Sequence, residues 1–252
     1  GGLDNQGDSS GNDVESIAEE ATPTPATSDV DPVEIDSVDA VGPCDGETWQ
    51  LYLPGLEGCD LSGTDLAGVD LGDADLRHAV LDGADLTDAR LVGAQLFAAS
   101  LVDAELGGAQ LDKANLAQAD LSGANLAGAS MLDARLPLSS LVDATLDGVD
   151  LRFADLTEAN LAGISAAALG DRIALLDKAN LSRARLSDAD FAQASMYRAS
   201  LEFAQLDGTD FSNADLSLAN LTQAEVTGAD FTGANLEGAN LTGVQTGAAT
   251  GL

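Results

Sequence analysis

A large apolar residue stands at nearly every fifth position from Leu61 to Leu241. Of the 37 such positions only two, Ala166 and Asp171, lack a large apolar side chain. A period of five fits neither the 3.6-residue period of an α-helix nor the two-residue period of a strand. A chain with this pattern has to turn once in each repeat and stack its repeats, as solenoid proteins do.

The repeats share one formula around the central apolar residue. It is Ala, then Asp or Asn, then Leu, then two variable residues, and it stands in full at Ala84–Leu86, Ala124–Leu126 and Ala214–Leu216. The central position holds Phe at residues 191, 211 and 231 only, which are twenty apart. Twenty residues are four repeats, so a coil of four repeats would stack these rings in one column at the strand spacing of about 4.8 Å. The alternative is a recent duplication of a twenty-residue segment, which also implies a twenty-residue unit.

This pattern, from Cys59 to about Gln245, resembles the pentapeptide repeat family. The resemblance implies an all-β fold, a right-handed quadrilateral parallel β-helix of about nine coils. It also implies that the Leu and the Ala point inward while the other three residues face solvent. Mild departures occur in the inner Ala position, at Thr64, Val69, Ser139, Val149 and Thr209.

The charge balance narrows the classes of partner. Lys and Arg number 10 against 43 Asp and Glu, a net charge of −33. Such acidity argues against direct binding of nucleic acid or of an anionic membrane and favours a basic protein partner or a cation-rich medium. No run of 18 apolar residues is present, so the sequence encodes no membrane span.

Residues 1–40 form a separate acidic region. They carry eleven acidic residues and no Lys or Arg, among many Gly, Ser, Thr and Pro. This composition predicts a disordered tail or linker, because too little apolar surface is available to offset the entropy of ordering. The chain starts at Gly1 rather than Met, which suggests a processed product such as a bacterial lipoprotein with its lipid-bearing Cys before Gly1. An arbitrarily chosen boundary is an equal alternative.

Residues 41–58 are expected to cap the first coil. A solenoid needs such a cap because its first coil exposes apolar side chains and unpaired strand edges. Cys44 and Cys59, the two cysteines of the chain, flank the Trp49 segment where the repeats begin. We expect them to form a disulfide, which favours an oxidising, extracytoplasmic compartment. The alternative is a pair of buried thiols in a cytoplasmic protein.

The repeat lapses once, at residues 164–175. The five-residue phase continues across the lapse, since Leu161 and Leu176 are 15 apart. We therefore expect an irregular coil that stays on the wall of the helix. The alternative is a loop or helical turn that bulges outward, as in family members that inhibit DNA gyrase.

Catalytic and cofactor motifs are lacking. His78 is the sole histidine and falls in an outward position, so no Ser-His-Asp or Cys-His arrangement can be assembled. One His and two Cys are too few for a structural zinc site, and no glycine-rich phosphate loop is present. The sequence predicts a protein that is not an enzyme and needs no cofactor.

An acidic ridge is predicted beside the Phe column. Asp190, Asp210 and Asp230 each precede one of the three Phe residues, so they should form a column as well. We entertain a weakly bound divalent cation there, against the plainer interpretation of a solvated face. A second column, on the opposite face, is expected to carry Asn160, Asn180, Asn220 and Asn240.

Outward apolar residues suggest a docking patch on adjacent faces. They are Leu132, Pro137, Leu138 and Val142, with Val92, Phe97 and Val102 two coils away. Scattered exposed apolar residues are ordinary on soluble proteins, so chance is the alternative.

Besides cation binding along the acidic ridge, two functions are compatible with these features. The first is a non-enzymatic structural or protein-interaction module, an acidic rod that is exported and tethered by its N-terminal tail. The second is a DNA mimic that inhibits or protects a type II topoisomerase. From residue 59 onward 29 acids and 10 bases give a net charge of −19. Over roughly nine coils this is about one charge per 2.3 Å, near the one per roughly 1.7 Å of duplex DNA. Against the second function, residues 246–252 carry no helical pattern, whereas gyrase-binding relatives dimerise through a C-terminal helix.

Overall fold

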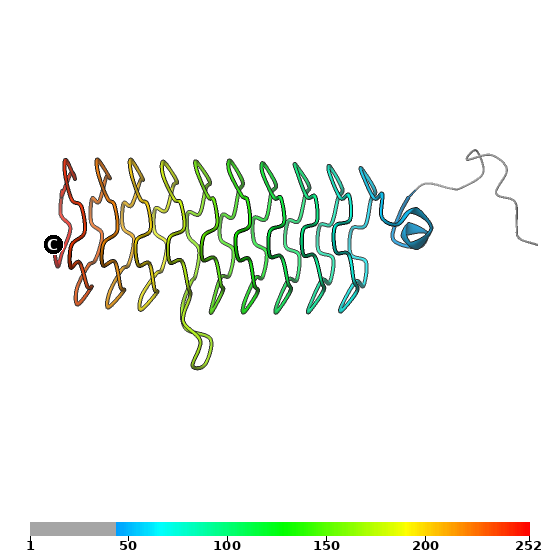
Figure 1. The fold of residues 1–252 in the computed structure, drawn as a ribbon, viewed down its shortest axis with the longest axis horizontal. Helices are drawn as coiled ribbons and strands as arrows, with labels where there is room; N and C mark the ends of the chain where they lie inside the picture. Colours follow the sequence, from blue (N-terminus) through cyan, green and yellow to red (C-terminus); the bar gives the residue numbers. More distant parts are fainter. Residues whose placement is uncertain (1–43) are drawn as a thin grey trace, which may run out of the picture. The chain divides into compact units, whose positions relative to one another are not determined.

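The computed structural model describes residues 44–252 as a solenoid of twenty-residue coils (Figure 1). Four ladders of parallel β-bridges run along it, and each ladder pairs a residue with the residue twenty positions later. The four ladders give each coil four sides. The bridging residue is always the one before the central apolar residue, so we call it the bridge residue. The predicted tail at 1–40 lies outside the described residues.

Each repeat folds in the same way, as the unit around Leu116 illustrates. The Leu116 amide donates to the Arg135 carbonyl of the next coil at 2.7 Å, and the Ala119 amide donates back to the Leu116 carbonyl at 3.0 Å. The second bond closes a four-residue turn whose third residue, Gln118, has φ 60°. A positive φ at this place is the mark of a type II turn. We call this third turn residue the corner residue, because the chain changes side there.

The bridge residue explains why the repeat is rich in Asp and Asn. The Asp120 carboxylate accepts the Ser122 amide at 3.0 Å, and the Asn220 side chain accepts the Thr222 amide at 3.1 Å. Such local bonds are characteristic of Asp and Asn at turns. Much of the acidity of the rod therefore serves the fold itself.

These bonds also set the acidity of the carboxyl groups. At Ser62, Ser122 and Thr157 the hydroxyl and the amide of the same residue both donate to the carboxylate. Hydrogen bonds from the side chains and amides of Ser62 and Thr87 hold the pKa values of Asp60 and Asp85 below their ordinary value of 3.8. The carboxylates are favoured because they accept both bonds.

The core consists of the inward Leu and Ala side chains, stacked coil upon coil. Leu116 is 0% exposed, as are nearly all the other central residues. Phe191, Phe211 and Phe231 form the predicted column, with successive ring centroids 5.7 and 5.1 Å apart. Thr209 stands at an inner position that usually holds Ala. Its buried hydroxyl group has a hydrogen-bond partner, because it donates to the Leu186 carbonyl at 2.7 Å.

The N-terminal end is closed by the cap segment. Its 3-10 helix η1, Trp49–Tyr52, is the single named helix or strand among residues 44–252. Trp49 is 5% exposed and joins the hydrophobic core, and Tyr52 packs against it. Asp45 pairs with Asp60, which links the cap to the first coil. No helix in this part of the chain is long and apolar enough to span a membrane.

The expectation of an irregular coil at 164–175 is wrong, because the segment leaves the wall as a hairpin (Figure 1). Ser165 bridges to Asp190, 25 residues later, so five residues are inserted into one coil. Leu169 and Arg172 pair antiparallel, with N–O distances of 2.7 and 3.1 Å. An insertion of five residues preserves the repeat phase, which is why spacing alone could not reveal it.

The insertion also changes which residues share a column. Asn180, Ser200, Asn220 and Asn240 follow one another in a ladder, but Asn160 pairs with Arg185 instead. The predicted Asn column was therefore wrong in its first member. A separation of twenty residues holds on either side of the insertion, and a separation of 25 holds across it.

Candidate functional site

The protruding hairpin is seated on glycines of the neighbouring coils. The Arg172 guanidinium donates to the Gly128 carbonyl at 3.1 Å. A Cβ at Gly148 would lie 2.8 Å from the Leu169 Cβ, closer than side-chain atoms can approach. Glycine at this corner therefore makes room for the hairpin. Leu169 and Ile173 remain exposed on it.

The two cysteines lie at the junction of cap and rod. Cys44 and Cys59 are joined in a disulfide with their Cα atoms 5.0 Å apart. The Cys44 carbonyl also accepts the Asp60 amide at 3.1 Å. The covalent bond and the hydrogen bond hold the cap on the first coil.

The three Asp residues of the predicted ridge are consecutive members of one ladder. Asp190, Asp210 and Asp230 each accept the amide of the residue two positions on, at 2.9, 2.7 and 2.8 Å respectively. Hydrogen bonds from the Thr232 side chain and amide lower the pKa of Asp230. Among residues 44–252 no group of three or more His, Cys, Asp or Glu residues is arranged to hold a metal ion. These carboxylates are engaged in shaping corners.

The predicted docking patch spreads around the rod. Leu132, Pro137 and Val142 follow one another at intervals of five residues, so they stand beside three successive corners. Leu138 is the exposed member, at 55%, whereas the other three are half-buried. Because five residues advance the chain by one side of the coil, only Pro137 and Leu138 share a corner.

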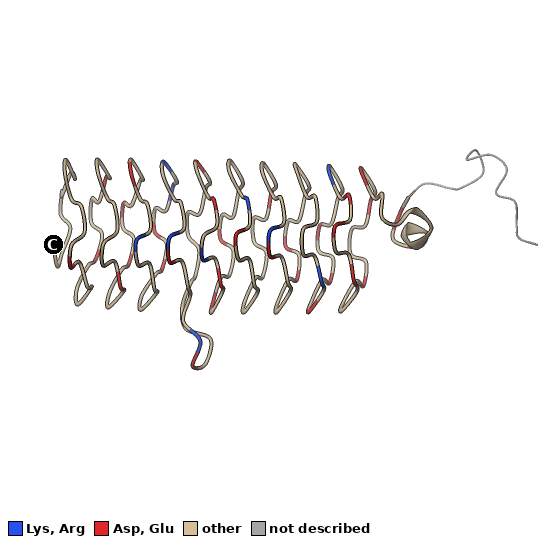
Figure 2. Cartoon of the chain, in the orientation of Figure 1, with Lys and Arg blue, Asp and Glu red and all other residues tan. Residues whose placement is uncertain are grey.

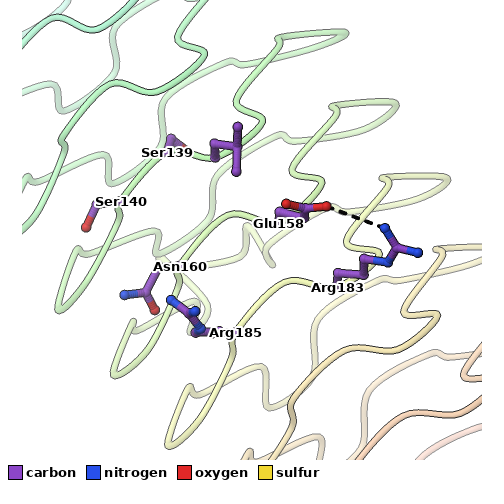
Figure 3. Close-up of a pocket in the computed structure, with 7 residues that line it drawn as sticks. Ser139, Ser140, Glu158, Asn160, Arg183 and Arg185 are labelled. Carbon is purple, nitrogen blue, oxygen red and sulfur yellow. Dashed lines mark ion pairs between the residues drawn. The ribbon is translucent and has the colours of Figure 1, made fainter.

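An open hollow of about 540 Å³ adjoins Leu138 (Figure 3). Arg183 crosses it to Glu158, with Nη1 and Oε1 3.5 Å apart. Arg185 lies beside Asn160 and has no carboxylate partner among residues 44–252. Sequence reasoning missed this hollow, because the five-residue insertion is what brings residues 158 and 160 beside 183 and 185.

No described residues form a catalytic arrangement. The sole histidine, His78, is an exposed corner residue whose ring meets Phe97 edge to face at 5.7 Å. The hollows at Leu138, Leu175 and Leu218 are open to solvent.

A comparison with protein-family models decides the family. The model described as pentapeptide repeats matches in eight copies, over residues 59–96, 89–128, 104–141, 125–163, 174–213 and 214–245. The chain belongs to the pentapeptide repeat family. The break between the fourth and fifth matched ranges coincides with the hairpin. Pentapeptide repeat proteins are generally structural or interaction modules.

Three solved structures are similar to this chain. HetL, a pentapeptide repeat protein involved in heterocyst differentiation regulation from the cyanobacterium Nostoc sp. strain PCC 7120, is 36% identical, with a TM-score of 0.46 over 75% of this chain and 84% of HetL. QnrB1, a plasmid-mediated fluoroquinolone resistance protein, is 16% identical over 71% of this chain and 92% of its own, with a TM-score of 0.46. A pentapeptide repeat protein of the Arabidopsis thaliana thylakoid lumen is 32% identical over 42% of this chain and 70% of its own, with a TM-score of 0.32. The comparison with curated protein sequences gives no match.

Proposed function

We propose that this protein is a non-enzymatic interaction module, a right-handed acidic rod of about nine coils that binds another protein through its outer sides. The observation that carries the proposal is that inward and outward positions of the repeat have different roles. The Leu and Ala of each unit are buried in a continuous core, and the three remaining residues form long, rigid outer sides. Rigid repetitive surfaces of this kind are what solenoid proteins use for binding.

The charge of the rod sets the kind of partner that approaches it. The net charge of −19 from residue 59 onward attracts a basic protein over a Debye length of about 8 Å at physiological salt. A basic partner should therefore associate faster at low salt than at high salt.

Export is the second part of the proposal. The disulfide between Cys44 and Cys59 supports an oxidising compartment, since such bonds are rare in reducing cytoplasm. Residues 1–40, which lie outside the described residues, would serve as the tether to a cell surface or membrane, with or without a lipid anchor.

Affinity capture tests the binding proposal. The full chain and a core-disrupted variant, Leu116→Asp, are immobilised and exposed to extract from the source organism at low and high salt. The proposal expects a stoichiometric protein that binds the folded chain and not the variant, and that is released by salt. Recovery of the same proteins on both chains would contradict it. Cell fractionation with alkylation of free thiols tests export.

Mimicry of DNA toward a type II topoisomerase is the alternative function. The protruding hairpin at 164–175 favours it, because gyrase-binding relatives carry loops that matter for function. The near-DNA charge density favours it too. The test is a gyrase supercoiling assay with the full chain and with a variant lacking the hairpin. Inhibition or protection that depends on the hairpin would support this alternative.

A further inference from the structure

One side of the rod differs from the others in both charge and apolarity. It lies between two neighbouring corner columns, and we call it the mixed side. Its first edge is the corner column that holds Phe153, Lys178, Arg198 and Leu218 on successive coils. The Lys178 ammonium lies over the Phe153 ring, 4.9 Å from its centroid, and the Arg198 guanidinium lies over the Tyr197 ring at 5.2 Å. Cations held over rings in this way are preorganised.

The second edge is the next corner column, which holds Leu138, Glu158, Arg183 and Phe203. Arg183 bridges the apolar and acidic members, since it pairs with Glu158 at 3.5 Å and lies 5.7 Å from the Phe203 centroid. The hollow of about 540 Å³ adjoins this edge but opens on the next side, since its lining continues to Ser140, Asn160 and Arg185. The hollow of about 220 Å³ at Leu218 is lined by Tyr197, Ser217 and Glu237, which precede the first corner column. Both hollows therefore flank the mixed side and open away from it.

Exposed apolar surface on the regular coils gathers at these two edges. Among the outward positions of the described coils, the large apolar side chains that are exposed number four. They are Leu138, Phe153, Phe203 and Leu218, at 55, 50, 46 and 45% exposure. Single exposed apolar residues are ordinary, but four that border one side form a patch rather than a scatter.

The charge of the mixed side departs from that of the rod. Between Lys113 and Gln223 its outward residues include five basic ones, Lys113, Arg135, Lys178, Arg183 and Arg198. The acidic ones number four, Asp133, Asp155, Glu158 and Glu202. The local balance is thus one positive charge, on a rod whose net charge from residue 59 onward is −19. Figure 2 shows how acidic and basic residues are distributed along the coils.

Most of these cations lack a carboxylate partner. Within residues 44–252, Lys113, Arg135, Lys178 and Arg198 make no ion pair with Asp or Glu. Three of the four cations elsewhere on the regular coils are paired, for example Arg90 with Asp70 at 2.7 Å and Arg152 with Asp150 at 2.6 Å, and Arg185 is the exception. These cations remain unpaired and close to exposed aromatic rings even though the chain has an excess of carboxylates. They are therefore available to bind carboxylates of another protein.

We propose that the mixed side binds a protein segment in which Asp or Glu alternates with apolar side chains. The inference rests on the proposed interaction function and names one surface and the local chemistry of the segment that binds it. The net charge of the whole partner is a separate property, which the charge of the whole rod selects. Arg and Tyr are among the residues on which protein interfaces concentrate binding energy, and Phe is enriched at interfaces. Unpaired cations select carboxylates, and the exposed Phe and Leu side chains at the two edges contact the apolar side chains. Nucleic acid also binds cations and rings, but the rod's excess of negative charge repels a polyphosphate far more than a segment with a few carboxylates.

Selection from a random dodecapeptide library against the immobilised full chain tests the inference. Enriched peptides are measured by fluorescence polarisation against a variant that removes two cations, Lys178→Gln with Arg198→Gln. The matched control is Gln193→Glu with Asn213→Asp, which changes the net charge equally in corner positions outside the mixed side. A second variant, Phe153→Asn with Phe203→Asn, removes the two Phe rings and keeps Tyr197. Asn tolerates the positive φ of these corners, so this variant should stay folded.

We expect enriched peptides that combine Asp or Glu with apolar residues, and a loss of affinity of about tenfold in the cation variant and in the ring variant. The control should lose less than about twofold, since its distance leaves only screened electrostatics. Enrichment of basic peptides, equal losses in variant and control, displacement by single-stranded DNA, or no enrichment at all would overturn the inference. The affinity-capture experiment is independent of this outcome, so a rod that binds its partner through another side would still be recognised.

Discussion

Substitution at Leu116 compared with substitution at Asp120 tests the division between core and outer sides. Leu116 is 0% exposed and lies in a column of Leu side chains. Truncating such a residue to Ala costs about 2–5 kcal/mol of unfolding free energy. Leu116→Asp should cost more than that, because it also buries a charge without a partner.

Asp120 faces outward and contributes hydrogen bonds rather than packing. Its carboxylate accepts the Ser122 amide at 3.0 Å and the Ser122 hydroxyl. Asp120→Ala should therefore cost about 0.5–1.5 kcal/mol, the net value of a typical hydrogen bond. Asp120→Asn is the matched control. It keeps an acceptor that the repeat itself uses at Asn115 and Asn125, and should change stability by less than about 0.5 kcal/mol.

Urea unfolding followed by circular dichroism measures all three variants. The expected order of destabilisation is Leu116→Asp, then Asp120→Ala, then Asp120→Asn. Similar losses for the first two would refute the assignment of inward and outward positions. Equal losses for Asp120→Ala and Asp120→Asn would refute the turn-bond explanation of the acidic repeat.

Three further predictions concern the cap, the hairpin and pH. Intact mass before and after reduction and alkylation should show one disulfide between Cys44 and Cys59, and reduction should cost about 3 kcal/mol for a loop of about 15 residues; freely alkylated thiols in native protein would contradict both the bond and export. Deleting the five residues Leu169–Ile173 should leave Tm within a few degrees, since it restores the twenty-residue coil, whereas deleting three residues there should unfold the adjoining coils; equal effects would refute the insertion. Because the pKa values of Asp60, Asp85 and Asp230 are lowered on folding, their stabilisation is present above the ordinary value of 3.8 and is lost as pH falls through the lower folded values. In about 0.5 M salt, which screens the net charge, Tm should be flat from about pH 7 to pH 5 and fall below about pH 4; a Tm that rises on acidification below pH 4 would contradict this.

The repeat predicts the solenoid and its core because it constrains every coil. The Phe column at 191, 211 and 231 could be assigned from spacing, since no insertion interrupts those residues. The hairpin could not, because five inserted residues leave the phase intact.

The hollow and the mixed side could not be predicted from the sequence, because both depend on the insertion that forms the hairpin. A strict period of twenty places Phe153 over Ile173, but the structure places Lys178 there, at a separation of 25. The pairing of Arg183 with Glu158 and the neighbourhood of Arg185 and Asn160 depend on the same shift. To predict which residues meet across an insertion, its length must be known. The sequence does not reveal this length, because an insertion of five residues leaves the repeat phase unchanged.

Photo-crosslinking in the source organism tests the central claim, that this rod acts by binding a protein through its outer sides. A benzophenone amino acid is placed in the full chain at Phe153 or Phe203, and at Asn213 as a control on a corner outside the mixed side. The account predicts one discrete protein adduct from Phe153 and Phe203, and none or far less from Asn213. An absence of protein adducts at all three positions would contradict the central claim. The same adducts in equal yield at all three would contradict the mixed side as the binding surface.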